Sequence, residues 1–272
     1  MKTIIVATDF SPAATNAAHY AAEMAVAINA KLFLLHVYQI PVAYLKVPVV
    51  LNEDEMREEA DKKLIQLKNE LDIKTGDKLN FETEIRMGVF FQELKELCEK
   101  VQPYAVVMGS QGTTATERLF FGGHAVYAMK HLTWPLITVP PEVKFNAIKK
   151  IGLACDFDKV IDTTPVEEIK LLVKDFNAQL HVLNTGKQKV FNPNIVFESG
   201  LLQEMLAELK PNYHFTTNSN TDEGIIDFSE RNHLDLLLVL PKRHGLIDSL
   251  VHKSHTKQLV LHSHVPVMAL HQ

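Results

Sequence analysis

Residues 3–14 read Thr-Ile-Ile-Val-Ala-Thr-Asp-Phe-Ser-Pro-Ala-Ala, and this stretch decides the fold. Its uncharged, mostly apolar run, Thr3–Thr8, is typical of a strand that is buried on both faces of a sheet. Asp9 follows the strand, and Ser11 before Pro12 predicts a helix N-cap with proline in the first turn. A strand that passes directly into an alanine-rich helix, predicted over Ala13–Ala30, indicates the first unit of an α/β fold.

Strands and helices continue to alternate after this unit. The sequence predicts further strands at Lys31–Tyr38, Asn80–Arg86, Ala105–Met108 and Pro135–Val139. It predicts helices at Glu53–Leu71, at Phe90–Val101 and from about Gly122 to Leu132. Such alternation is typical of a parallel sheet with helices on both of its faces.

The same pattern then starts again in the second half of the chain. Lys150–Asp156 repeats the first strand and its aspartate, and Gln179–Val182 repeats Leu34–Val37 with His181 over His36. The prolines near the last strands, Pro135 and Pro266, also correspond. We therefore predict two tandem domains, residues 1–141 and 147–272, each a parallel five-stranded sheet with helices on both faces.

Composition narrows the classes of function. Hydrophobic residues make up 46% of the chain and its net charge is −5, which favours a globular protein and gives nucleic acid no general attraction. The apolar runs are shorter than the roughly 18 residues of a membrane span. Two cysteines do not make a disulfide framework, which favours a reducing compartment. We expect a cytoplasmic protein without nucleic-acid or membrane partners.

A glycine loop follows the strand Ala105–Met108. Gly109 and Gly112 precede a segment of nine residues, 113–121, which ends at Gly122 and Gly123. In open parallel sheets, ligands bind at the carboxyl ends of the strands, and glycines let backbone N–H groups approach an anion closely. A helix beginning near Gly122 would add its N-terminal dipole. The loop therefore indicates a phosphate site, and glycines that merely permit tight turns are the alternative.

At these residues the chain resembles the universal stress protein family in a tandem two-domain form. The family pattern is Gly-x-x-Gly, nine residues, Gly and then Ser or Thr. Gly109, Gly112 and Gly122 match it, whereas Gly123 stands where the family has a hydroxyl residue. The opening VATDFSPAA, the strand LLHV and the closing WPLITVP add to the likeness. The resemblance implies flavodoxin-like, or adenine-nucleotide α-hydrolase-like, domains.

The resemblance also implies an ATP site in the first domain, with or without Mg²⁺. On the adenine and ribose side it places Ala7, Asp9 and Val37, with Asp9 accepting a hydrogen bond from a ribose hydroxyl and the Val37 backbone pairing with adenine. On the ribose and phosphate side it places Met108, Gly109, Gly112, Gly122, Gly123 and the backbone of His124. Asp9 has an alternative role, because an aspartate before Ser-Pro also stabilises a helix start.

The second domain departs from this pattern. Leu240-Pro241-Lys242-Arg243-His244 stands where the first domain has Met108 to Gly112, and Lys253 takes the place of Gly122. Without these glycines we expect no nucleotide site of the family type there. A side-chain anion site made by Lys242, Arg243 and Lys253, or a solvated basic surface, stays open. Histidines cluster near the C-terminus, but no cysteine or acidic residue stands beside them at ligand spacing, so we expect no metal site.

Together with the glycine loop, the resemblance implies a stress-response protein that binds ATP as a sensor or regulator. No nucleophile elbow, Walker loop or His-Glu-x-x-His motif is present, so we expect no fast enzyme and leave slow ATPase activity open. A nucleotide-independent interaction module is the alternative, motivated by Gly123 and by the altered second loop. The final strands, Leu136–Val139 and Val267–Leu270, are expected to pair or pack as an intramolecular pseudo-dimer. A further homodimer and the protein partner stay open.

Overall fold

The computed structural model describes residues 1–39, 53–110, 115–185, 193–218, 220–241 and 255–271. The first half contains β1 (Thr3–Ala7), α1 (Pro12–Ala27), β2 (Lys31–Tyr38), α2 (Glu53–Thr75), β3 (Phe81–Met87), α3 (Phe90–Val101), β4 (Ala105–Gly109), α4 (Ala115–His131) and β5 (Leu136–Val139). The second half contains β6 (Lys150–Ala154), α5 (Val160–Thr163), α6 (Val166–Phe176), β7 (Gln179–Thr185), α7 (Pro193–Met205), the 3₁₀ turn η1 (Ala207–Leu209), β8 (Asn212–Thr216), α8 (Thr221–Arg231), β9 (Leu236–Val239), α9 (His255–His262) and β10 (Val267–Ala269).

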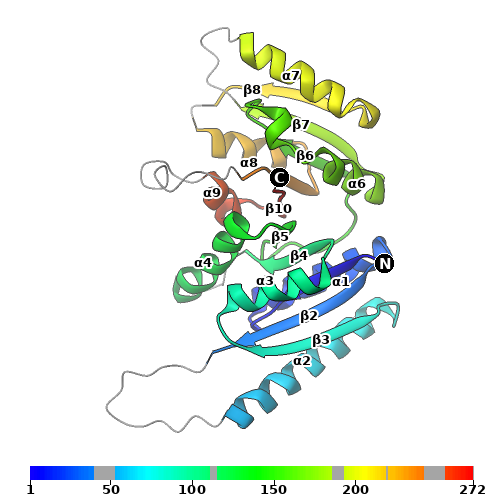
Figure 1. Ribbon diagram of the computed structural model, residues 1–272, viewed down its shortest axis with the longest axis vertical. Helices are drawn as coiled ribbons and strands as arrows, with labels where there is room; N and C mark the ends of the chain where they lie inside the picture. Colours follow the sequence, from blue (N-terminus) through cyan, green and yellow to red (C-terminus); the bar gives the residue numbers. More distant parts are fainter. Residues whose placement is uncertain (40–52, 111–114, 186–192, 219, 242–254, 272) are drawn as a thin grey trace.

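All these strands belong to one sheet, in the order β3-β2-β1-β4-β5-β10-β9-β6-β7-β8 (Figure 1). Neighbouring strands within each half are parallel. The halves meet at β5 and β10, which pair antiparallel with Thr138 opposite Val267. The expected fold of two tandem α/β domains is confirmed, and their two sheets are continuous across this pair.

Helices cover both faces of the sheet because the strands are apolar on both faces. In β1, Ile4 and Val6 belong to the core cluster that contains residues of α1, α2 and α6 on one face, whereas Ile5 and Ala7 belong to the cluster that contains residues of α3, α4 and α8 on the other. Burial of each large aliphatic side chain contributes about 1.5–3 kcal/mol. In the described part of the chain, no helix has the length and apolar character needed to cross a membrane.

Helix α1 begins where the sequence predicts. The Ser11 hydroxyl accepts a hydrogen bond from the Ala14 N–H at 3.2 Å, and Pro12 opens the helix. The alanines that face the sheet are fully buried, and their small side chains let α1 lie close to it. The segment after β5 is tied to the same helix, since the Asn16 amide donates to the Pro140 and Val143 carbonyls at 3.1 and 2.9 Å.

Helix α4 begins earlier than the sequence predicts. It starts at Ala115, so Gly122 and Gly123 lie about two turns inside it rather than at its N-terminus. The physical reason is the segment 115–121, Ala-Thr-Glu-Arg-Leu-Phe-Phe, which includes several good helix formers and no glycine or proline. Inside a helix each N–H donates to the carbonyl four residues before it. The N–H groups of Gly122, Gly123 and His124 are therefore engaged within α4.

The sheet register corrects the internal repeat. Ala7 of β1 stands opposite Leu35, and the equivalent Ala154 of β6 stands opposite Leu183. Asn184, and not His181, therefore takes the place of His36. His181 and His36 face opposite sides of the sheet, because successive residues of a strand alternate between its faces. The apparent match of LLHV with QLHV was out of register.

His181 instead forms a pair with His214. The Nδ1 of His181 and the Nε2 of His214 lie 3.0 Å apart, and the two rings stack at 5.2 Å between centroids. Burial lowers the pKa of both imidazoles, and each positive charge on His214 or Lys150 lowers the pKa of His181 further. One ring donates to the other only while at least one is neutral.

This pair predicts a loss of stability in mild acid. The unfolded histidines titrate near pH 6.5, above the folded pKa values, so the unfolded chain binds more protons as the pH falls through this range. The contribution of the neutral histidine pair to the free energy of unfolding is fully present above about pH 6.5. It is lost as the pH falls from there through the lower pKa values of the folded protein. We expect the free energy of unfolding in urea to depend less on pH between 7.5 and 5.5 in His214→Gln. The exposed His264→Gln is the control, and an unchanged slope in His214→Gln would contradict this assignment.

Candidate functional site

A pocket of about 270 Å³ opens at the carboxyl ends of β1, β2 and β4. Strand order reverses at this point, since β2 and β4 lie on opposite sides of β1, and such switch points are where open α/β sheets bind ligands. Its volume is close to the lower end of the range for small-molecule sites, ~300–1,000 Å³. The lining includes Ala7, Asp9, Val37, Met108, Gly109 and His124, which the resemblance had assigned to a nucleotide.

The remaining expected residues fall elsewhere. Gly122 and Gly123 are inside α4 and do not line the pocket. His124 lines it from within α4, so its exposed side chain, and not a free backbone N–H, faces this region. Gly112 lies outside the described residues. The structure therefore brings together the adenine and ribose side of the expected site and separates it from the glycines expected at the terminal phosphates.

The turn after β1 carries Asp9 to the pocket mouth. Its Oδ1 accepts a hydrogen bond from the Ser11 N–H at 2.9 Å, while the Phe10 N–H donates to the Thr8 hydroxyl at 3.0 Å. Phe10 has φ of 64°, a left-handed conformation that is strained for a side chain of this size. Asp9 thus stabilises the turn that leads into α1, in agreement with its alternative role, and its carboxylate retains further lone pairs for a ligand hydroxyl.

Gly109 is required by packing. A Cβ at this position would lie 2.9 Å from the backbone carbon of Ala13 and 3.0 Å from its oxygen. Backbone atoms at the start of α1 cannot move aside as a flexible side chain would. By contrast, a Cβ at Gly123 would meet nothing within 4 Å. Gly109 and Gly123 therefore differ, because of the two only Gly109 permits a close approach.

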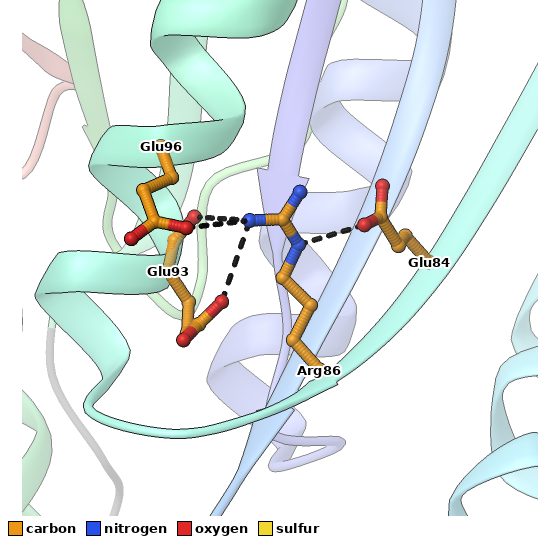
Figure 2. A network of polar contacts seen from close by, with 4 residues as sticks. All are labelled: Glu84, Arg86, Glu93 and Glu96. Carbon is orange, nitrogen blue, oxygen red and sulfur yellow. Dashed lines mark hydrogen bonds and ion pairs between the residues drawn. The ribbon is translucent and has the colours of Figure 1, made fainter.

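An arginine lies among three glutamates between β3 and α3 (Figure 2). The Nε of Arg86 donates to Glu84 at 2.7 Å, and its Nη1 donates to the carbonyl and carboxylate of Glu93 at 3.1 and 3.4 Å. Glu96 completes the group at 3.9 Å. These contacts tie β3 to α3, whose first residue, Phe90, lines the pocket.

Phe90 is also in edge contact with His124, with ring centroids 5.1 Å apart. Neither Arg86 nor Phe90 was expected at the site from a sequence motif. Alternating glutamates in β3 and the pair Glu93 and Glu96, one turn apart at the start of α3, were the available signal for a partly buried cation. No local pattern predicted the Phe90–His124 contact, because the two residues come from different helices.

The second half repeats the turn but not the cradle, by which we mean the close approach of the start of α1, at Ala13, to Gly109. Phe157 is left-handed like Phe10, with φ of 54°, and follows Asp156 in the position of Asp9. The register pairs Ile4 with Ala105 and Ile151 with Leu236, which places Leu240 at the position of Gly109. This corrects the sequence alignment, in which Pro241 stood there. Lys242, Arg243 and Lys253 lie outside the described residues.

The helix after β6 differs accordingly. Helix α1 packs along β4, whereas the corresponding segment is divided into the short α5 and a separate α6 that follows Pro165, and neither packs along β9 in this way. Leu240 packs against the core on this face. A leucine at the position of Gly109 is incompatible with the close helix approach seen in the first half. Among the described residues, no group of three His, Cys, Asp or Glu is placed to hold a metal ion.

The two glycines give a matched prediction. Gly109→Ala should lower the free energy of unfolding by about 1–3 kcal/mol, because the new methyl group meets the Ala13 backbone. Gly123→Ala should raise it by about 0.5–1 kcal/mol, because alanine favours the helix and meets no neighbour. Urea unfolding measures both. Equal effects of the two substitutions would show that the close approach at Gly109 is not limiting.

Comparisons with known proteins agree with this architecture. The model of the universal stress protein family matches residues 1–140. A universal stress protein of Methanocaldococcus jannaschii is 28% identical over 142 residues, which span 51% of this chain and 81% of that protein. The solved structure of a universal stress protein from Archaeoglobus fulgidus aligns over 99% of this chain and 96% of its own, with TM-score 0.74 and 17% identity. A functionally unknown Pseudomonas aeruginosa protein aligns over 100% and 92%, with TM-score 0.63 and 12% identity. The chain belongs to the universal stress protein family.

Proposed function

We propose that this protein binds an adenine nucleotide in the pocket of its first half and acts as a sensor or regulator in a stress response. The observation that carries the proposal is the position of Ala7, Asp9, Val37 and Met108 around one pocket at the strand switch point. These residues come from three strands or the turns that follow them, and the same position in the fold is a ligand site in many α/β proteins.

The lining suits the nucleoside part of such a ligand. Val37, Met108 and Phe90 offer apolar contact to a flat base. Asp9 stands at the mouth, where a carboxylate would accept hydrogen bonds from ribose hydroxyls. The space of about 270 Å³ is small, which favours a single nucleoside unit over a larger ligand. This end of the pocket therefore fits the expected adenine and ribose.

The phosphate end is different. The N–H groups of Gly122, Gly123 and His124 are hydrogen-bonded inside α4, so they would reach an anion only if the first turns of α4 unwound. We propose that ATP favours such a conformation and that AMP does not require it. A ligand with different affinity for two conformations shifts their populations, which is how a sensor without turnover works. Mg²⁺ would accompany the phosphates of ATP.

A nucleotide-independent interaction module is the second candidate. The observation that favours it is the early start of α4 at Ala115, because the N–H groups of Gly122, Gly123 and His124 are then bonded within the helix. In that case the pairing of β5 with β10 would serve as an intramolecular pseudo-dimer contact that presents a surface to a protein partner. We propose domain limits of 1–141 and 147–272, and a role other than fast catalysis, under either candidate.

Titration calorimetry of the full chain with Mg-ATP, ADP and AMP tests the proposal. Asp9→Ala should weaken binding roughly 10- to 100-fold, because hydrogen bonds to a charged group contribute about 1.5–3 kcal/mol. Asp156→Ala is the matched control: Asp156 also accepts a turn hydrogen bond, from the Asp158 N–H at 3.3 Å, but it belongs to the second half. The nucleotide affinity of Asp156→Ala should stay within about twofold of that of the parent protein.

The outcomes separate the two candidates. Binding that Asp9→Ala weakens and Asp156→Ala preserves supports a nucleotide site in the first half. Equal losses in both variants would indicate a general effect on folding instead of a ligand contact. If a correctly folded parent protein bound none of the three nucleotides, the interaction module would be preferred. Phosphate release above the buffer rate would show slow ATPase activity.

A further inference from the structure

The turn after β1 is held by a side chain of the neighbouring strand. The Nδ1 of His36, in β2, lies 2.8 Å from the carbonyl oxygen of Thr8. Because a carbonyl oxygen only accepts hydrogen bonds, Nδ1 carries the proton and donates it. The His36 ring also packs on Phe10, with centroids 4.5 Å apart. One imidazole therefore contacts both ends of the segment Thr8–Phe10 that carries Asp9.

The second half makes the same contact with another residue. Asn184 occupies the position of His36 in the sheet register, and its Nδ2 donates to the carbonyl of Cys155 at 2.9 Å. Cys155 is the counterpart of Thr8, and its sulfur accepts from the Phe157 N–H as the Thr8 hydroxyl accepts from the Phe10 N–H. Two different side chains thus supply an N–H to equivalent carbonyls of the two halves, which identifies the donated hydrogen bond as the shared requirement.

Only the first turn borders the described pocket. Thr8 and Asp9 line it, whereas His36 does not. His36 therefore acts on a ligand through the turn. The left-handed Phe10 needs this support, because a residue in that region persists only when its surroundings hold it there.

We propose that His36 is a positioning residue of the nucleotide pocket, in which its Nδ1–H holds the Thr8–Phe10 turn so that Asp9 faces the ligand. This inference rests on the proposed function. It differs from a pH switch, because both the neutral ring in this tautomer and the protonated ring carry the Nδ1 hydrogen. The requirement is an N–H donor of suitable reach, and the chain itself shows that asparagine meets it.

Two substitutions in the full chain test the proposal. His36→Leu removes the donor, and His36→Asn installs the side chain that the second half uses. With AMP and Mg-ATP as probes in calorimetry, we expect His36→Leu to bind about tenfold more weakly, because the Thr8 carbonyl loses its side-chain partner. We expect His36→Asn to stay within about threefold of the parent protein. Asn184→Leu, which removes the equivalent bond from the second half, should leave the affinity unchanged.

Amide hydrogen exchange provides a readout that needs no ligand. In the parent protein the Phe10 and Ser11 N–H groups are bonded within the turn. Their protection should fall in His36→Leu and persist in His36→Asn. If the parent protein bound neither nucleotide, the proposed function would fail while this measurement still decided the role of His36 in the turn.

The proposal is overturned if His36→Leu retains the parent affinity, or if His36→Asn binds as weakly as His36→Leu. It is overturned as well if Asn184→Leu loses affinity to the same extent, because the effect would then be one of general stability. Unchanged protection of the Phe10 and Ser11 amides in His36→Leu overturns it whatever the binding result.

Discussion

The close approach of α1 to the end of β4 is the contact on which the site depends. The Ala13 backbone lies only 2.9–3.0 Å from where a Cβ of Gly109 would stand, so α1 begins very close to the end of the strand. This places Ser11 and Pro12 immediately after the turn and brings Asp9 to the strand switch point. In the second half Leu240 stands at the equivalent position, and the following helix is divided into α5 and α6. Loss of one glycine is thus sufficient to account for the loss of the cradle.

The turn itself does not depend on that glycine. Asp9–Phe10 and Asp156–Phe157 share the left-handed phenylalanine and a side chain from the next strand that donates to the turn. The turn is present in both halves, although the second half lacks the cradle. The turn therefore meets a requirement of the strand-to-helix connection itself. Ligand binding in the first half would then use a turn that the fold already needs, and Asp9 would both hold the Ser11 N–H and contact the proposed ligand.

Much of the fold was predictable because its signals are local. Apolar runs identify the strands, and Ser11 with Pro12 fixes the start of α1 within one residue. The start of α4 was wrong because Gly122 and Gly123 were given more weight than the helix-forming segment before them. The register of β7 was wrong because apolar strands resemble one another at several offsets. Arg86 and His36 were missed because their partners lie on other elements, which periodicity does not reveal.

The sheet gives the second half a structural role even though that half lacks the cradle. Strand β5 would otherwise be an edge strand with unpaired backbone groups, and such edges invite aggregation. Antiparallel pairing with β10 satisfies those groups within one chain. Helix α4 lies on the same junction: its residue His124 lines the pocket, and the helix packs against α9, while His271 contacts the Met129 carbonyl at 3.0 Å. A ligand that changed α4 would therefore also change a surface that α4 shares with the second half. The second half would then have a role in the response to the ligand, in addition to pairing with β5.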